Sequence, residues 1–308
     1  MSIKKIRGAA LMLSLWALFL LSAMIVSWAL DIDSRLTLSG NANRLLEAEA
    51  MACSGAEVAL DRSIKPGSPN LSGGLGAGKS YEAHMTGEGG RLDVNWLVVA
   101  GENSLEILRR YLENKGIDLN ERDTMVDSLL DWVEQNTGLH HLNAPPESDD
   151  YHPAHALLTR VDELKKVAGW AEFTSVPGWD DDFTVNTLKS LSRGRIDVAW
   201  ASRDVLLALP GMTPERVDRF LQLRQGPDGI DGTDDDAQFR GPDDALVALG
   251  FNGEQLEKFK KLDLTFFKDP VFRVVSVGKA GNATRTVQMV FTRVTVGGSP
   301  SVITWKEF

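Results

Sequence analysis

The first sixty residues carry the strongest hydrophobic pattern of the chain. A short basic head with Lys4, Lys5 and Arg7 is followed by residues 9–30, which include no charged side chain. At about 1.5 Å per residue, a helix of this length crosses the hydrocarbon core of a bilayer. No cleavage site of the Ala-x-Ala type follows the apolar run, so the pattern differs from that of an ordinary secretory signal. We therefore predict a transmembrane helix over 9–30.

A narrower apolar stripe continues beyond the predicted span up to residue 62, and no proline interrupts it. Its residues recur at spacings of three, four and seven, which is typical of one face of a helix. We therefore predict a single long helix over 9–62. Small residues allow helices to pack closely, so this face is expected to contact partner proteins. The face consists of Leu38, Ala42, Leu45, Ala52, Ala56 and Ala59.

Alternation of apolar and polar residues, the pattern of half-buried strands, appears at two places after this helix. The first place predicts two strands, 79–86 and 91–99, joined by a glycine-rich turn. The second place predicts three antiparallel strands near the end of the sequence, at 271–277, 285–296 and 301–306. Strands separated by a long insertion can still form one sheet, because a helical block closes on itself.

Between the two groups of strands, apolar residues fall at helical spacing. The phrase Gly90-Arg-Leu-Asp-Val-Asn-Trp96 recurs there as Gly194-Arg-Ile-Asp-Val-Ala-Trp200, which indicates a block with two parts. We predict a helical domain at 103–262, with subunits at about 103–193 and 194–262. Later helices within it are expected at 161–167, 185–191, 202–209, 214–223, 242–249 and 254–262.

Together these patterns predict an α+β fold. The long N-terminal helix packs on an antiparallel sheet, and the sheet belongs to a head formed by residues 63–102 and 263–308. The all-α domain is an insertion into this head.

The charge distribution predicts how the membrane helix is oriented. The basic head precedes the span, whereas Asp31 and Asp33 follow it, so the N-terminus is expected in the cytoplasm and the bulk of the chain outside. The formal net charge of −10 argues against a general nucleic-acid-binding surface. Cys53 is the single cysteine, so the exported part is expected to fold without an internal disulfide bond.

The start of the sequence resembles the class III signal of type IV pilins and pseudopilins. In those proteins a short basic leader ends in a glycine, here Gly8 at the end of 1–8, and a hydrophobic helix follows at once. The resemblance implies cleavage by the prepilin peptidase between Gly8 and Ala9, with methylation of the new N-terminus. Most such proteins carry a glutamate at the fifth mature position, where this chain has Leu13. That departure is characteristic of the minor pseudopilin K family of the type II secretion system.

The order of elements along nearly the whole chain also resembles the K family. Short phrases at 130–133, 147–151, 161–164, 194–198 and 209–212 contribute to this resemblance. It implies a pilin-like head with an inserted helical domain, of the SAM-like or helix-hairpin-helix-like kind, that binds calcium. It also implies a non-enzymatic protein of the inner membrane with a periplasmic globular part.

The same resemblance implies a place at the tip of the pseudopilus, beside minor pseudopilins of the I and J types. There the protein initiates pseudopilus assembly and contributes to protein export across the outer membrane. Two features fit a tip position. A bulky helical insertion would clash with subunits stacked above it, and Leu13 cannot form a salt bridge with the N-terminal amine of a preceding subunit.

An acidic loop is the strongest chemical signal of the sequence. Five aspartates fall within the nine residues 228–236, separated by glycines that permit tight turns. Calcium prefers carboxylate and carbonyl oxygens, and without a cation the carboxylates of such a loop repel one another. The spacing is not that of an EF-hand, and a solvated acidic turn is the alternative. We expect structural calcium at Asp228, Asp231, Asp234, Asp235 and Asp236.

A second candidate calcium site lies in the first half of the helical domain. The family pattern implies a further acidic residue shortly after Asp131-Trp132, but this chain has Gln135 and Asn136 there. The site is therefore expected to carry less charge than the first one. Its candidate ligands are Asp131, Glu147, Asp149 and Asp150.

Four of the five histidines lie within sixteen residues of each other, at His140, His141, His152 and His155. Zinc takes a tetrahedral set of nitrogen, sulfur or oxygen ligands, which such a cluster can supply. The spacing matches no metalloprotease helix, so surface histidines are the simpler interpretation and a zinc hydrolase is the alternative.

The segment Leu209-Pro-Gly-Met212 lies between two predicted helices and resembles a helix-hairpin-helix. In DNA-binding proteins such a hairpin offers backbone N–H groups to a phosphate. Here acidic residues nearly balance the arginines of 195–224, which favours a structural hairpin and no nucleic-acid partner. A membrane-anchored DNA uptake receptor is the alternative function. No Ser/His/Asp motif, P-loop or dinucleotide fingerprint appears, so no enzymatic activity is expected.

Overall fold

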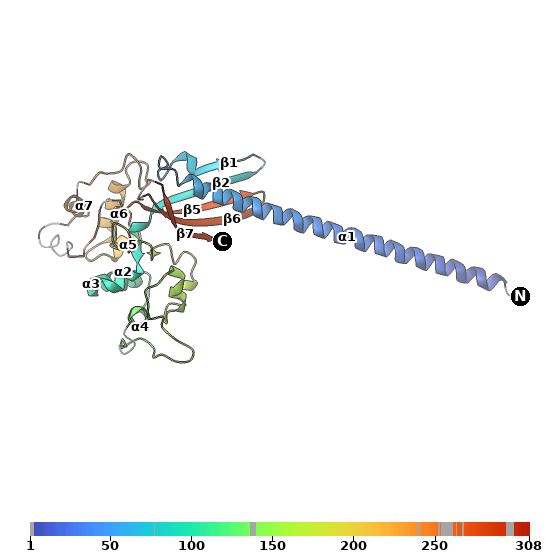
Figure 1. The fold of residues 1–308 in the computed structure, drawn as a ribbon, viewed down its shortest axis with the longest axis horizontal. Coiled ribbons are helices and arrows are strands. Elements are labelled where there is room, and N and C mark those ends of the chain that lie inside the picture. Colours follow the sequence, from blue (N-terminus) through green and yellow to red (C-terminus); the bar gives the residue numbers. More distant parts are fainter. Residues whose placement is uncertain are drawn as a thin grey trace.

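The computed structural model contains one long helix, a five-stranded sheet and a helical block (Figure 1). It describes residues 3–76, 78–135, 140–239, 241–251, 253, 261–262, 264–266, 268–293 and 299–308. The α-helices are α1 (Ile3–Val58), α2 (Val94–Val99), α3 (Glu102–Asn114), α4 (Leu119–Val133), α5 (Arg203–Ala208), α6 (Pro214–Arg224) and α7 (Pro242–Ala248). Short 3-10 helices are η1 (Pro69–Leu71), η2 (Glu88–Gly90), η3 (Val161–Lys166) and η4 (Phe173–Ser175). The strands are β1 (Ser72–Gly74), β2 (Lys79–Gly87), β3 (Leu92–Asp93), β4 (Phe183–Thr184), β5 (Val271–Ala280), β6 (Ala283–Thr292) and β7 (Ser301–Glu307).

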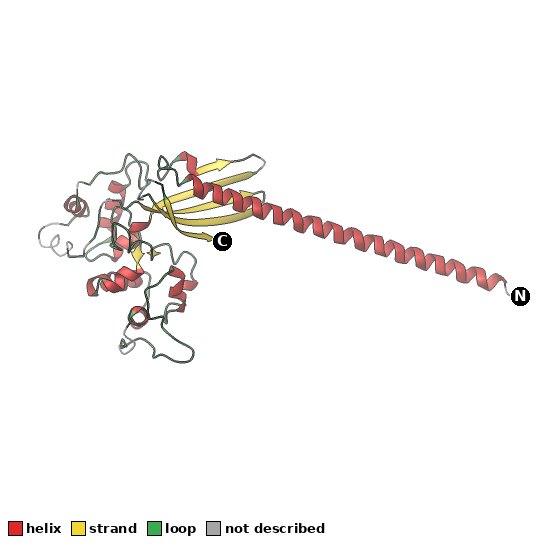
Figure 2. Ribbon diagram, in the orientation of Figure 1, coloured by secondary structure: helices red, strands yellow, loops and turns green. Residues whose placement is uncertain are grey.

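Helix α1 runs away from the rest of the molecule for most of its length (Figure 1). Side chains of residues 9–39 are exposed, including the whole predicted span 9–30. The helix is long and apolar enough to cross a membrane. No other part of the described protein buries its apolar part. Its C-terminal part lies on one face of the sheet, against β2, β5 and β6 (Figure 2).

The main sheet is antiparallel throughout, in the order β1-β2-β5-β6-β7. Strands β2 and β5 are neighbours although the helical block separates them in sequence, so the two predicted groups of strands form one sheet. This confirms the α+β fold with a long helix packed on an antiparallel sheet.

The predicted strand 91–99 is wrong beyond its first residues. Only Leu92–Asp93 is extended, and α2 begins at Val94. The carboxylate of Asp93 accepts hydrogen bonds from the backbone N–H groups of Asn95 and Trp96, which have no partner inside the helix. Alternating apolar residues therefore form a capped helix here.

Other local predictions in the helical block also differ from the structure. Segment 161–167 is the 3-10 helix η3, and 185–191 contains turns instead of a helix. Most of the predicted helix 254–262 lies outside the described residues.

Glycines set the close approach between α1 and the sheet. A Cβ atom on Gly278 would overlap the backbone of Ala48 and Ala52 in α1, and one on Gly55 would lie 2.7 Å from the Tyr81 ring. These positions therefore require glycine for steric reasons, and they bring the helix and the strand backbones together.

The small residues of the predicted partner face behave differently along α1. Ala52, Ala56 and Ala59 are fully buried in the core beneath the sheet of the same chain. The prediction of a partner contact is wrong for these three, because the head itself covers them. Leu38, Ala42 and Leu45 lie nearer the predicted span 9–30 and are exposed, so for them the partner contact stays a prediction.

The helical block has a hydrophobic core separate from that beneath α1. Phe183 is fully buried in it and makes edge-to-face contacts with Tyr111 and Trp170, at centroid distances of 5.3 and 5.9 Å. Buried aromatic pairs of this geometry contribute more than their area alone. The block can therefore hold its own shape beside the sheet.

The two copies of the repeated phrase contact each other. A Cβ atom on Gly194, which has φ of 81°, would lie 2.5 Å from Cβ of Trp96 in the other copy. Likewise, a Cβ atom on Gly90 would overlap the carbonyl of Trp200. Each copy thus provides a glycine that accommodates the tryptophan residue of the other, and the two phrases pack against each other.

Candidate functional site

A buried ion pair joins the sheet to the helical block. Glu88 in η2 is 0% exposed, and its carboxylate accepts hydrogen bonds from Nε and Nη2 of Arg273 in β5, at 2.8 and 2.9 Å. Thr184 Oγ1 of β4 donates to the same carboxylate at 2.5 Å, and Arg91 lies 3.3 Å away. Burial raises the pKa of Glu88, but the charges of Arg273 and Arg91 outweigh this and hold it below the ordinary value.

Two further buried carboxylates occupy equivalent places in the repeated phrases. Asp93 caps α2 with one oxygen and with the other accepts from the backbone N–H groups of Thr187 and Leu188, both at 3.0 Å. Asp197 accepts from the N–H groups of Ala199, at 3.1 Å, and Asp269, at 2.7 Å. Each aspartate therefore fastens a later segment of the chain to its own half of the block.

The pKa of Asp197 is raised from 3.8 to about 6, chiefly because burial disfavours the charged form. The folded state then binds more protons than the unfolded state between these values, so this contribution to stability is lost as the pH rises through 6. We predict that the free energy of unfolding falls by about 2–3 kcal/mol between pH 4 and 7 from this group. Urea unfolding of Asp197→Asn at both pH values should lack this fall. If the variant lost as much stability between pH 4 and 7 as the wild type, the raised pKa of Asp197 would be contradicted.

The acidic loop is held by cations of the chain itself. Arg224, 2% exposed, forms a bidentate salt bridge with Asp231, with Nε and Nη2 at 2.6 and 2.7 Å from the two carboxylate oxygens. Its Nη1 donates to the carbonyl oxygens of Val198 and Ala201 at 2.8 Å each. The arginine therefore ties the loop to the second repeated phrase.

Two lysines bind further carboxylates of the same loop. Lys268 Nζ lies 2.6 Å from Oδ2 of Asp236, whose side chain is fully buried. Lys65 forms a salt bridge with Asp234 at the surface. The repulsion between carboxylates, which led us to expect a bound cation, is thus relieved in part by side chains from outside the loop.

The remaining two aspartates bind within the loop. Asp228 Oδ1 accepts from the N–H of Ile230 at 2.8 Å, and Asp235 accepts from Thr233 Oγ1 at 2.6 Å and from the N–H of Asp228 at 3.1 Å. Within the described part of the chain, no three His, Cys, Asp or Glu side chains gather as a metal site. In this arrangement the five carboxylates bind groups of the chain itself, and calcium binding stays a prediction.

Two ligands predicted for the second calcium site, Asp131 and Glu147, take part in two separate histidine–carboxylate contacts. Asp131 Oδ2 lies 2.7 Å from Nδ1 of His140, and Glu147 Oε1 lies 2.9 Å from Nε2 of His155. A hydrogen bond to the carbonyl of Glu134 is the main reason why the pKa of His155 is raised. Each of the two carboxylates has a histidine as its direct partner.

The other members of these predicted sets lie at the edges of the two contacts. His141 donates its backbone N–H to Asp131 at 2.9 Å, and His152 Nδ1 is 4.0 Å from Glu147. Asp149 and Asp150 are exposed. The structure therefore pairs the four histidines with two different carboxylates, and zinc binding receives no geometric support from the described residues.

The hairpin between α5 and α6 uses its arginines internally. Arg203 forms a bidentate salt bridge with Asp218, at 2.7 and 3.2 Å. The guanidinium of Arg216 lies over the ring of Phe251, 5.1 Å from its centroid. No contact here favours the DNA-binding alternative over a structural hairpin.

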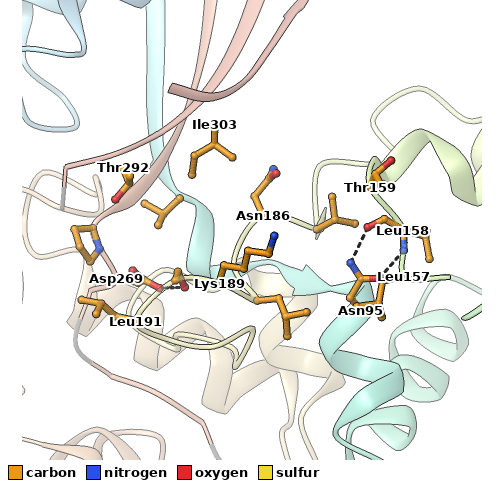
Figure 3. Close-up of a pocket in the computed structure, with 15 residues that line it drawn as sticks. Asn95, Leu157, Leu158, Thr159, Asn186, Lys189, Leu191, Asp269, Thr292 and Ile303 are labelled. Atoms are coloured by element: carbon orange, nitrogen blue, oxygen red, sulfur yellow. Dashed lines mark hydrogen bonds between the residues drawn. The ribbon is translucent and has the colours of Figure 1, made fainter. Parts of the chain in front are cut away.

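A cavity of about 660 Å³ lies where the ends of β5, β6 and β7 meet the helical block (Figure 3). Asn95 exchanges two hydrogen bonds of 2.8 Å with the backbone of Leu158 on one wall. Asp269 lies on the opposite wall and accepts from Ser190 Oγ at 2.7 Å, while Lys189 projects between them. The cavity therefore separates the sheet from the first half of the block.

The chain resembles known proteins at the level of structure. No protein-family model matches the chain, and no curated protein matches it. Among solved structures, it is similar to a chain of the GspK–GspI–GspJ complex from the enterotoxigenic Escherichia coli type 2 secretion system, with a TM-score of 0.58. The match covers 90% of this chain and 99% of that chain at 12% sequence identity. This chain has a GspK-like pseudopilin fold.

The GspK-like fold confirms the fold that the order of elements indicated. Sequence reasoning nevertheless missed the Glu88–Arg273 pair at the junction. Glu88 lies among Gly87, Gly89 and Gly90, a composition typical of exposed turns. The available signal for this buried residue was a single charge enclosed by glycines. Glycines occur in exposed turns, but they also permit another segment of the chain to approach closely.

Proposed function

We propose that this protein is a minor pseudopilin of the K type that caps the pseudopilus of a type II secretion system and initiates its assembly. The position of the helical block carries the proposal. The block lies at the end of the head that faces away from the exposed part of α1 (Figure 1). In a filament whose stems are helices like α1, the helical block would occupy the place of the next subunit. A subunit of this shape is therefore accommodated best at the tip.

The leader and the apolar span support a membrane-anchored precursor. Residues 9–30 hold the chain in the inner membrane, with the N-terminus in the cytoplasm and the head in the periplasm. The prepilin peptidase cleaves between Gly8 and Ala9, and the new N-terminus is methylated. The protein acts as a structural, non-enzymatic component of protein export.

The partners we propose are the I-type and J-type minor pseudopilins of the same system. GspK, the solved relative, is in a complex with GspI and GspJ. In this chain the exposed residues Leu38, Ala42 and Leu45 offer a helical face beyond the part that the sheet covers. Leu13 supplies no carboxylate for a preceding subunit, as fits a first subunit.

Gold labelling of assembled pseudopili tests the tip position. An epitope tag in the exposed 147–150 segment of the helical block is expected to label one end of each fibre. A matched tag on the major pseudopilin serves as the control and should label the whole length. Label from this protein spread along the fibre would overturn the proposal.

Calcium binding by the acidic loop is a separate part of the proposal. A calcium ion at Asp234 and Asp236 has to displace Lys65 and Lys268, so the gain in stability is expected to be moderate. At a free calcium concentration of about 100 times the Kd, binding adds about 2.7 kcal/mol. We predict that the full-length chain melts at a higher temperature in calcium than in magnesium or chelator. Asp235→Asn should abolish this difference, whereas Glu82→Gln, which changes an exposed carboxylate on β2, should not. Equal melting temperatures would exclude calcium.

A further inference from the structure

Strand β7 forms one edge of the main sheet, and no described strand pairs with its outer side (Figure 2). It is seven residues long, whereas β1 at the opposite edge has three. Val302, Ile303 and Trp305 on β7 are 45%, 43% and 38% exposed. Edge strands of soluble proteins are usually short, charged or covered, because their free backbone groups pair readily with other chains. This edge has the length and apolar character of a pairing surface.

The register shows which backbone groups face outward. Phe308 and Thr286 exchange two hydrogen bonds, at 2.9 and 3.3 Å, so they form a hydrogen-bonded pair across β6 and β7. Positions alternate in an antiparallel ladder, and therefore Glu307 and Trp305 are not hydrogen-bonded to β6. Their N–H and C=O groups point to the free edge. Two such residues, spaced by two, are what an added strand requires.

Acidic side chains gather beside one end of this edge. Glu307 and Glu49 line a small cavity of about 200 Å³ between β7 and α1, together with Arg285. Burial, followed by the charges of Glu307, Glu49 and Glu57, raises the pKa of Cys53 in α1. The carboxylates thus lie near one another and outnumber the single arginine, so a strand with a lysine or arginine at this end complements the edge.

We propose that β7 is a docking edge for an extended strand of a neighbouring minor pseudopilin. The strand pairs with the N–H and C=O groups of Trp305 and Glu307 and brings a basic side chain toward Glu307 and Glu49. It also covers the exposed apolar residues of β7. This inference rests on the proposed function, because the occupant is one of the pseudopilins that join this chain at the tip.

Two substitutions at one position separate backbone pairing from side-chain effects. Glu307→Ala and Glu307→Pro both remove the carboxylate and its 2.7 Å hydrogen bond with Trp305 Nε1, but only proline removes the N–H. That N–H faces away from β6, so proline leaves the ladder of this chain intact. Binding of the full-length I-type and J-type pseudopilins to the full-length chain is measured in detergent. Glu307→Pro is expected to bind one of them about tenfold more weakly than Glu307→Ala.

Each outcome of this experiment has a distinct meaning. Equal binding by Glu307→Pro and Glu307→Ala overturns the docking edge and leaves the proposed function standing. If the wild-type chain binds neither pseudopilin, the proposed function fails and the docking edge fails with it. Self-association through β7 that excludes both pseudopilins also overturns the inference. Should Glu307→Pro melt at a lower temperature than Glu307→Ala, the pair Trp305→Pro and Trp305→Ala repeats the test at the other outward-facing N–H.

Discussion

Glu88→Gln is expected to lower the free energy of unfolding by about 3–5 kcal/mol, because it leaves the charge of Arg273 buried without its partner. Glutamine has nearly the same shape, so the loss reports on charge rather than on packing. It also weakens the attachment of the helical block, since Glu88 binds both Arg273 of the sheet and Thr184 of the block. Urea unfolding of the full-length chain in detergent, followed by tryptophan fluorescence, measures the change.

Glu82→Gln is the matched control for this prediction. Glu82 lies on β2 and is exposed, so its substitution is expected to change the free energy of unfolding by less than about 0.5 kcal/mol.

The pKa of Glu88 is lowered in the folded state, so the stability that it contributes is present above the ordinary carboxyl pKa and is lost as the pH falls through the folded value. Similar effects of the two substitutions at pH 7 would show that the buried pair does not hold the junction.

Gly278→Val is expected to destabilise the head by about 3 kcal/mol, because the new side chain collides with the backbone of α1 at Ala48 and Ala52. A flexible side chain could move aside, but a helix backbone pressed against a sheet cannot do so without losing contact along its length. We expect α1 to lose contact with β5 and to become sensitive to proteolysis within the segment that carries Ala52. Limited proteolysis together with urea unfolding measures both effects.

Gly40→Ala provides the control on the same helix. Apart from the nearby backbone of α1 itself, no atom lies within 4 Å of the Cβ position at Gly40, and alanine favours a helix by up to about 1 kcal/mol over glycine. The variant is expected to be at least as stable as the wild type. If Gly278→Val were as stable as Gly40→Ala, close packing of α1 on β5 would not be the contact that holds the head together.

The long-range layout was predictable from the sequence because its signals are strong and repeated. An uncharged run at 9–30 followed by a helical stripe, and alternation at 271–277 and 285–296, leave few other arrangements. That the strands on the two sides of the insertion form one sheet was expected for the same reason. Such patterns describe burial over many residues, and burial determines which elements form.

Local details depended on contacts that are distant in sequence. Alternation at 91–99 indicated a strand, but the capping bonds of Asp93 and its contacts with Thr187 favour a helix start. The small residues Ala52 and Ala56 indicated a helical contact surface correctly, yet the covering surface belongs to the same chain. Sequence spacing shows that a face is buried without showing what buries it.

The candidate metal ligands illustrate the same limit. Five aspartates in nine residues signalled a need for positive charge, and the structure meets part of that need with Arg224, Lys65 and Lys268. None of these three cations lies inside the acidic run itself, so the run alone cannot distinguish them from a calcium ion. The outward-facing edge of β7 was likewise hidden, because it depends on register with β6.

We propose that the chain is a processed pseudopilin whose apolar helix is retained as a filament stem. Intact mass and N-terminal peptide analysis of the protein purified from its native membrane test this claim most directly. A processed pseudopilin is expected to yield a mature chain that begins at methylated Ala9. A chain that retains Met1, or one that begins beyond Leu30, would contradict it.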